Sequence, residues 1–478
     1  MRLFVIEWAN GLPEMVDVIR EIKKDGHEIS YWSGCNLGRI PKVEFPNTVF
    51  HDHFDALAGR PAPGVDDSEF PPPGEDLLVQ LADVESTTLT MMNKKYPSLS
   101  VDERKHFYYH LVKYWSGVLK KFQPEAIIFL VTPHTVYNFV IYSLAKLFGL
   151  KTIMFDVVLM DGYRMIGLND YKKGNSDLEN AIVGQGQDYS VSDLGAGIRS
   201  YYERQTSQRI DATPAYTREY VASRSGRNLL LLRVKIIWKS IANLSIFKKI
   251  FDFVMTEIGS NMKKEYVQVQ TEPGFGKPFV YLSLNYQPEA TTSPMGGVFV
   301  DQLLMIETLA AAIPPDWLIY VKEHPGQWIT NSKRYFSYRY RGYYKEIIRL
   351  PNVRLMPVVT SNYDLINNAR AVATVTGTPG WEALLRSKPV LVFGYPWYQH
   401  CSGVFKVNSA ESCKIAIEKI INGFKVEKQA IINFLYHFGN LSWPGYNDEN
   451  TKKLAAIDSR GVKDGYVRFL LAQIKKQV

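Results

Sequence analysis

Cysteine is rare in this chain: Cys35, Cys401 and Cys413 are the only ones among 478 residues. They form no CxxC pair, and no histidine stands at the spacing of a zinc site. We interpret them as reduced, incidental thiols, and the sequence predicts no bound metal.

Long apolar runs without charge are absent as well. No stretch reaches the length of about 18 residues that a helix needs to cross a bilayer. The N-terminal residues 1–8 read as the start of a strand and lack the charged, apolar and small-residue parts of a signal peptide. We therefore expect a cytoplasmic protein without a membrane-spanning helix.

Signatures of nucleic-acid binding are missing, although the formal net charge is +8. Such a charge is compatible with nucleic acid, an anionic membrane surface or a polyanionic substrate. The chain has no zinc-finger, basic-zipper or RNA-recognition motif, and its basic residues are spread through predicted helices. We expect no nucleic-acid partner.

The N-terminal half also lacks a GxGxxG motif, which argues against a dinucleotide site. Its apolar pattern predicts a strand over residues 3–7, a helix over 13–24 and a strand over 27–32, the start of a βαβ unit. A later strand is predicted over 152–155. We assign residues 1–170 to a Rossmann-like domain for the acceptor and for catalysis.

From residue 279 onward, strands and helices alternate regularly up to residue 393, with one helix predicted near 335–348. This alternation predicts a parallel α/β sheet with right-handed crossovers. We assign 276–440 to a second Rossmann-like domain and 441–478 to helices that cross back to the first domain.

Residues 171–275 interrupt the alternation, and we assign them to a helical insertion. Within it, lysine and arginine punctuate the apolar run 229–253 at near-helical spacing. Such a helix could lie on an anionic membrane surface. The alternative is an interdomain helix whose apolar stripe is core and whose lysines are solvated.

Residues 376–382 read Thr-Gly-Thr-Pro-Gly-Trp-Glu and follow a short β-branched run. Thr378 can cap a helix whose first residue is Pro379, and Gly377 and Gly380 leave the backbone open to a ligand. Free N–H groups at the start of this helix would attract an anion. Glu382 could accept hydrogen bonds from sugar hydroxyls; the alternative is an ordinary strand-to-helix turn.

A second polar cluster, Lys322-Glu323-His324-Pro325, follows the predicted strand 317–321. Pro325 ends the strand and fixes the backbone beside the imidazole of His324. Two strand ends that present polar groups at one sheet edge are typical of an open α/β binding crevice.

These clusters, together with Gln287-Pro288-Glu289 and the run 388–394 (Lys-Pro-Val-Leu-Val-Phe-Gly), resemble the capsule polysaccharide biosynthesis family, which includes β-Kdo transferases. The resemblance covers about residues 279–398. It implies a GT-B fold, with two Rossmann-like domains facing a cleft, and transfer of a sugar from a nucleotide-activated donor such as CMP-Kdo. It also implies that the His-Pro and Gly-Thr turns hold the donor phosphate and ribose, with Gln287 and Glu289 on the donor side.

Glycosyl transfer also needs an acid–base group or nucleophile. Strand ends of the N-terminal domain offer Asp156, Asp161 and Glu7, of which we favour Asp156, and His134 is a further candidate. The alternative is that Asp156 only caps the next turn. No DxD-like pair follows a strand in the C-terminal domain, so we expect a metal-independent enzyme without a cofactor.

Three other functions remain open. A polyol-phosphate transferase of the teichoic-acid type shares the architecture but would carry Asp-Tyr-Ser-Ser in place of Thr376-Gly-Thr-Pro. A nucleotide-sugar 2-epimerase and a non-catalytic carbohydrate-binding component of capsule assembly are the others. For a transferase, the expected partners are the nucleotide sugar, a glycan or lipid-linked acceptor and, through the basic run, the inner face of the cytoplasmic membrane.

Overall fold

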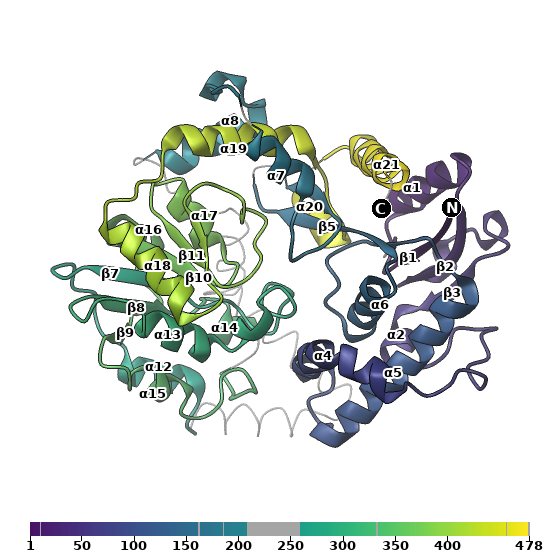
Figure 1. Ribbon diagram of the computed structural model, residues 1–478, viewed down its shortest axis with the longest axis horizontal. Helices are drawn as coiled ribbons and strands as arrows, with labels where there is room; N and C mark the ends of the chain where they lie inside the picture. Colours follow the sequence, from purple (N-terminus) through teal and green to yellow (C-terminus); the bar gives the residue numbers. More distant parts are fainter. Residues whose placement is uncertain are drawn as a thin grey trace, which may run out of the picture.

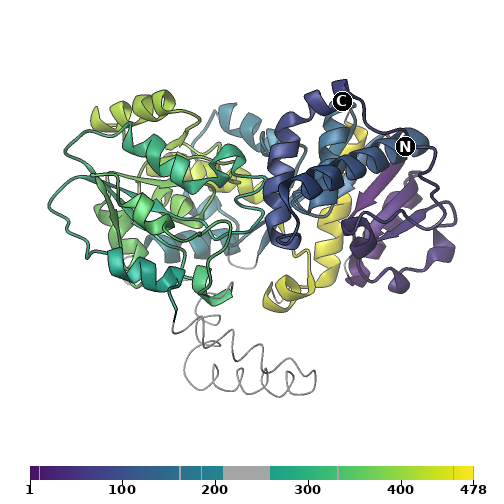
Figure 2. The same ribbon diagram turned by 90° about the horizontal axis from the view of Figure 1, so that it is seen from below.

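The computed structural model describes residues 1–9, 11–160, 163–184, 186–207, 259–330, 333–455 and 457–476. Asp161 and the basic run 229–253 lie outside the described residues. The described chain forms two lobes, the N-terminal domain on the right of Figure 1 and the C-terminal domain on the left. The same two lobes lie side by side in Figure 2.

The N-terminal domain is built on a seven-stranded sheet in the order β13-β6-β5-β4-β1-β2-β3. Strands β1 to β5 run parallel, whereas β6 is antiparallel to β5 and β13 is antiparallel to β6. The strands before the domain boundary are β1 (Arg2–Ile6), β2 (Glu28–Gly34), β3 (Val49–Asp52), β4 (Ala126–Phe129), β5 (Lys151–Val158) and β6 (Arg164–Leu168). The helices are α1 (Pro13–Lys24), α2 (His53–Leu57), α3 (Glu75–Gln80), α4 (Ala82–Lys95), α5 (Val101–Phe122) and α6 (Val136–Leu147).

Local signals define several of these helices. α1 begins at Pro13, whose missing N–H would be unpaired at a helix start in any case, and it carries two lysines in its last turn. α5 begins with a capping box in which Ser100 and Glu103 each accept the other's backbone N–H. Two apolar clusters cover the two faces of the sheet.

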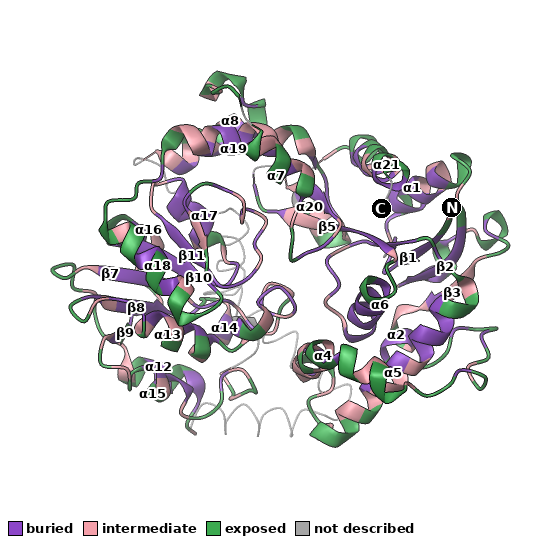
Figure 3. Cartoon of the chain, in the orientation of Figure 1, coloured by how far each residue is buried: buried purple, intermediate pink, exposed green. Residues whose placement is uncertain are grey.

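The C-terminal domain has a six-stranded, wholly parallel sheet in the order β12-β11-β10-β7-β8-β9. Its strands are β7 (Phe279–Ser283), β8 (Leu318–Lys322), β9 (Val353–Leu355), β10 (Ala371–Thr374), β11 (Val390–Val392) and β12 (Val404–Lys406). Its helices are α12 (Met262–Val269), α13 (Gln302–Ala310), α14 (Gln327–Thr330), α15 (Tyr343–Ile347), α16 (Asn362–Asn368), α17 (Thr378–Leu384) and α18 (Ala410–Ile421). These strands are largely buried, as Figure 3 shows, because helices cover both faces of a parallel sheet.

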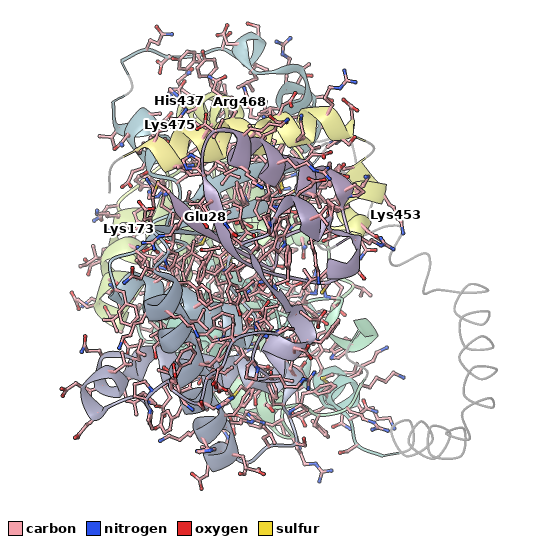
Figure 4. All side chains as sticks on the ribbon, turned by 90° about the vertical axis from the view of Figure 1, so that its right-hand side faces the viewer. Glu28, Lys173, His437, Lys453, Arg468 and Lys475 are labelled. Carbon is pink, nitrogen blue, oxygen red and sulfur yellow. The ribbon has the colours of Figure 1, made fainter. Side chains whose placement is uncertain are left out.

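The chain then returns to the first domain through α19 (Lys428–Leu441), β13 (Ser442–Pro444), α20 (Glu449–Ala455) and α21 (Ser459–Lys475). β13 adds a strand to the N-terminal sheet, and α21 packs against α1. Figure 4 shows α21, which carries Arg468 and Lys475, beside that domain. Between the domains, α7 (Ser176–Val183) packs against α19, and α8 (Ala196–Thr206) follows.

The predicted GT-B-like class, with two Rossmann-like domains, is confirmed by these two sheets. In each sheet the strand order reverses once, between β1 and β4 and between β7 and β10. Ligands of open α/β sheets bind outside the carboxyl ends of the strands at such a reversal.

Two local predictions were wrong. The helix predicted near 335–348 is instead a tight turn followed by the short α15, and Phe336 and Arg339 exchange backbone hydrogen bonds across that turn. The strand predicted over 152–155 extends to Val158, because β6 pairs with its second half.

Candidate functional site

A cavity of about 650 Å³ opens at the carboxyl ends of β7, β8 and β10. It lies at the reversal between β7 and β10, where the fold predicts a ligand. Most of its wall comes from the C-terminal domain, and Leu159 comes from the end of β5. The lining residues are Leu159, Tyr281, Ser283, Leu284, Asn285, Tyr286, Glu289, Thr291, Lys322, Glu323, His324, Pro325, Ser361, Asn362, Tyr363, Thr376, Gly377, Thr378, Pro379 and Glu382.

The two predicted clusters therefore meet in one cavity. Lys322 and His324 come from the end of β8, and Thr376 to Thr378 come from the loop between β10 and α17. Glu289 joins them from the loop after β7.

Lys322 is a buried residue of the cavity wall. Its ammonium donates hydrogen bonds to the Thr360 carbonyl and to Oδ1 of Asn362. Burial lowers the pKa of Lys322 to about 8, although the nearby Glu382 raises it in part. Among the described residues the hydrogen bonds of Lys322 thus go to neutral oxygens, and a buried cation of this kind is suited to meet an anionic ligand.

His324 faces the cavity in a defined tautomer. The backbone N–H of Gly326 donates to Nδ1 at 3.1 Å, so in the neutral ring the proton is on Nε2. Desolvation lowers the pKa of His324, with Lys322 and Arg339 adding to the effect against the pull of Glu323. The neutral imidazole can therefore donate one hydrogen bond from Nε2.

Glu323 and Gln287 were predicted to bind the sugar donor. In the structure their side chains instead make hydrogen bonds within the C-terminal domain. The Glu323 carboxylate pairs with the buried Arg339 at 2.6 Å and accepts the Tyr344 hydroxyl at 2.7 Å. Gln287 accepts from Arg339 at 2.7 Å and donates to the Val300 carbonyl at 2.8 Å. Gln287 is not part of the cavity wall.

The Gly-Thr turn differs in detail from its prediction. The cap of α17 is Gly377 rather than Thr378, which is the first helical residue and turns an exposed side chain to the cavity. Gly380 lies outside the cavity wall, and a Cβ added there would stand 2.3 Å from the Tyr398 hydroxyl. Gly380 thus permits close packing inside the domain rather than close approach of a ligand.

Glu382 is buried at the cavity wall, and its Oε2 has no hydrogen-bond partner within the described part of the chain. Burial raises the pKa of Glu382, while Arg386 and Lys322 oppose this shift. Buried carboxylate oxygens are nearly always paired, so this one is available to a ligand hydroxyl.

Asn285 is a site residue that the sequence reasoning missed. Its Oδ1 accepts the Thr374 hydroxyl at 3.1 Å and the Val375 N–H at 3.3 Å, and thereby ties the end of β7 to the end of β10. The available signal was an asparagine directly after the apolar strand 279–284. Asn362, which holds Lys322 and accepts the Tyr281 hydroxyl at 3.0 Å, was missed too.

In the N-terminal domain, Glu7 follows β1 with a left-handed backbone, φ 56°. Its carboxylate accepts hydrogen bonds from His53 Nδ1 at 3.0 Å, Thr135 at 2.9 Å and Asn138 at 2.7 Å. Burial would raise the pKa of Glu7, but the bonds from His53 and Thr135 and the nearby His134 lower it overall. Glu7 is a paired carboxylate that orients its neighbours, and it does not line the cavity.

His134 stands at the boundary between the domains. It lines a small hollow together with Lys94 of α4, and the opposite wall includes Glu289 and Tyr338 of the C-terminal domain. Its Nδ1 donates to the Thr132 carbonyl at 2.8 Å, which leaves the Nε2 lone pair unprotonated in the neutral ring. Glu289 belongs to this hollow and to the donor-side cavity alike.

Asp156 lies within β5, paired across to Ile166, and not at a strand end as predicted. Its Oδ1 accepts the Val157 N–H at 2.9 Å. Burial raises the pKa of Asp156 to about 6. The residue is absent from the walls of the cavity and of the small hollow.

Within the described ranges, no group of three or more His, Cys, Asp or Glu side chains is arranged to hold a metal ion. No helix in those ranges is long and apolar enough to cross a bilayer.

Residues 290–422 match the family described as capsule polysaccharide biosynthesis protein. The match therefore shows that this segment of the C-terminal domain is similar to that family. The matched segment contains His324 and the Thr376–Glu382 turn, and the predicted resemblance is confirmed. No curated protein sequence matches the chain.

Among solved structures, the chain is similar to a UDP-GlcNAc 2-epimerase from Methanocaldococcus jannaschii, with 13% identity, 90% of this chain and 95% of the other covered, and a TM-score of 0.23. It is also similar to the KpsC β-Kdo 2,7 transferase from Thermosulfurimonas dismutans, with 12% identity, 79% and 95% covered, and a TM-score of 0.30. The β-Kdo 2,4 transferase of the same protein gives 14% identity, 66% and 87% covered, and a TM-score of 0.30. Because these identities and TM-scores are low, the fold assignment rests on the strand order of this chain.

Proposed function

We propose that this protein is a glycosyltransferase of capsule or surface polysaccharide biosynthesis that uses a nucleotide-activated sugar. The observation that carries the proposal is the cavity at the β7/β10 reversal, which combines a buried lysine, a histidine donor and an unpaired carboxylate oxygen. The family match over 290–422 supports the same assignment, because it spans most of this wall.

The donor's phosphate lies against Lys322 and His324. The Lys322 ammonium neutralises phosphate charge, and His324 donates a hydrogen bond from Nε2. Glu382 accepts a ribose hydroxyl through its unpaired Oε2. CMP-Kdo is the donor that the family resemblance suggests, and in this mechanism Lys322 and His324 take the place of a metal.

The acceptor approaches from the N-terminal domain, where His134 serves as general base. Its Nε2 takes the proton of an acceptor hydroxyl while that oxygen bonds to the anomeric carbon of the donor sugar. The bond from this carbon to the donor phosphate oxygen breaks, and its electron pair leaves with the nucleotide. The Thr132 carbonyl keeps His134 in the required tautomer.

Asp156 is the competing candidate for this role. Its pKa of about 6 suits an acid–base group at neutral pH. Its place inside β5 favours His134, because Asp156 lines neither the cavity nor the hollow beside it.

The test measures transfer of labelled sugar from CMP-Kdo and other nucleotide sugars to capsular glycan fragments. Lys322→Met should weaken donor binding at least about tenfold, since a hydrogen bond to a charged group contributes about 1.5–3 kcal/mol. Lys406→Met is the matched control, because Lys406 is another desolvated lysine of this domain with a pKa of about 8 and lies outside the cavity wall.

Equal donor binding by Lys322→Met and Lys406→Met would refute the donor site. Release of free nucleotide and an epimerised sugar, with no glycan product, would identify a 2-epimerase. Donor binding without turnover on any glycan would leave a binding component of capsule assembly.

A further inference from the structure

A second hollow of about 450 Å³ lies between the end of α4 and the turn 335–341. Its wall includes Asn93 and Pro97 on the N-terminal side and Phe336, Tyr338, Tyr340 and Arg341 on the other. We call this hollow the aromatic groove. α4 lies on the inner side of its lobe in Figure 1, so the groove runs between the two domains.

Aromatic rings line the groove without being buried in it. Phe336 is 38% exposed and Tyr340 is 40% exposed, although large apolar side chains are usually covered. The guanidinium of Arg341 stands over the ring of Tyr335 at 5.6 Å, where it can still donate hydrogen bonds. The groove therefore alternates flat apolar faces with polar groups.

The turn 335–341, which carries these rings, is fixed by backbone hydrogen bonds and by the buried side chain of Arg339. Phe336 and Arg339 exchange two backbone hydrogen bonds of 3.1 Å each. The Arg339 side chain is buried, pairs with Glu323 at 2.6 Å and stacks over Tyr343 at 4.6 Å. A ligand thus meets preformed ring positions and has little ordering cost to overcome.

The groove continues into the transfer site. Tyr338 lines both the groove and the hollow of His134, and Glu289 lines both that hollow and the donor-side cavity. The Tyr338 hydroxyl is buried and has no hydrogen-bond partner in the portion of the chain that the structure describes. A hydroxyl-rich ligand that passes from the groove toward His134 would supply this partner.

We infer that the aromatic groove binds the acceptor as an extended glycan chain whose growing end reaches His134. A sugar ring presents apolar C–H faces and a rim of hydroxyls, which matches exposed rings interleaved with Tyr338, Asn93 and Arg341. A lipid tail would instead favour a wall of aliphatic side chains. The inference rests on the proposed function for the identity of the transfer site, but glycan binding can be measured without turnover.

The experiment measures binding of the full-length protein to an array of bacterial surface polysaccharide fragments, without donor. We expect the parent to bind glycan fragments and the double variant Phe336→Ala/Tyr340→Ala to bind them about tenfold more weakly, the loss expected for two aromatic contacts. Arg341→Gln, which leaves the rings in place, should also weaken binding. Phe275→Ala is the matched control, since Phe275 is 47% exposed and lies outside the groove.

Lys322→Met should bind the array like the parent, because it alters only the donor side. That comparison separates the two proposals. If Lys322→Met loses donor binding but keeps glycan binding, both proposals are supported. If the parent transfers no sugar from CMP-Kdo but binds glycan through the groove, the groove alone is supported. Absence of glycan binding by the parent would overturn the inference. Equal binding by the parent, the double variant and Arg341→Gln would overturn it as well.

Discussion

Single residues in this protein receive their chemistry from burial. Lys322 has a pKa of about 8 because desolvation of its ammonium outweighs the opposing effect of the nearby Glu382. Burial disfavours the charged form of any group, so it lowers the pKa of a lysine and raises that of a carboxylate. The pKa of Asp156 is accordingly raised to about 6. Both groups therefore change charge near the pH range in which an enzyme works.

Donor affinity should depend on the charge of Lys322. Below a pH of about 8 the ammonium is charged and attracts phosphate; above it the amine is neutral and the attraction is lost. We expect the affinity for a nucleotide sugar to fall by about tenfold between pH 7 and pH 9.5, measured by calorimetry. Lys322→Met should bind weakly with little pH dependence. A parent affinity that stays constant over this range would contradict the role of Lys322.

The acceptor-side base should be separable from donor binding. His134→Gln keeps the size and polarity of the side chain but removes the basic nitrogen, so kcat should fall by about 10²–10⁴ while donor affinity persists. Asp156→Asn and Glu7→Gln are the comparison variants. If Asp156→Asn abolishes turnover and His134→Gln does not, the carboxylate favoured by the sequence is the catalytic group.

Among the elements, the turn 335–341 and the end of β8 depend on one another. Arg339 reaches from the turn to Glu323, directly before His324, and to Gln287 in the loop after β7. The predicted donor residues Glu323 and Gln287 thus serve as anchors for the loops that form the site. Their role is to position these loops, because a buried ion pair can fix local geometry even where it adds little net stability.

Removing one partner of this pair should be costly. Arg339→Met leaves the Glu323 charge buried without its cation, and we expect the free energy of unfolding of the C-terminal domain to fall by about 3–5 kcal/mol. Urea unfolding followed by tryptophan fluorescence measures this loss. The double variant Arg339→Met/Glu323→Leu should recover much of it, since no unpaired charge remains. A double variant as unstable as the single one would argue against this account.

At the scale of the whole molecule, the C-terminal segment joins the two domains. Tyr446 and Lys452 both contact Glu14 of α1, and the ammonium of Lys452 lies 2.7 Å from the carboxylate. Burial would raise the pKa of Glu14, but the bonds from Lys452 and Tyr446 lower it overall. Residues just after β13 therefore stabilise the first helix.

This contact should stabilise the protein only where Glu14 is ionised. Because folding lowers the pKa of Glu14, the stabilisation is fully present above its unfolded value of about 4.5 and is lost as the pH falls through the lower folded value. We expect Glu14→Gln to cost about 2 kcal/mol at pH 7 and progressively less below pH 4.5, measured by thermal unfolding of parent and variant. A difference that grows on acidification would contradict the assignment.

Local chemistry allowed the sequence to determine much of the fold. The predicted helix over 13–24 matches α1, because a proline start and apolar periodicity act within a few residues. The alternation after residue 279 specified the parallel sheet, and the Lys-Glu-His-Pro and Thr-Gly-Thr motifs specified two strand ends at one cavity.

Only the tertiary structure decided which of those side chains are free. The sequence predicts Glu323 as a donor-binding group, but its carboxylate pairs with Arg339, 16 residues away along the chain, on the turn that carries the aromatic groove. His134 and Glu289 share a hollow because the two domains pack against each other. Residue spacing cannot reveal such partners, because a buried charge pairs with whatever the fold brings within about 4 Å, however distant in sequence.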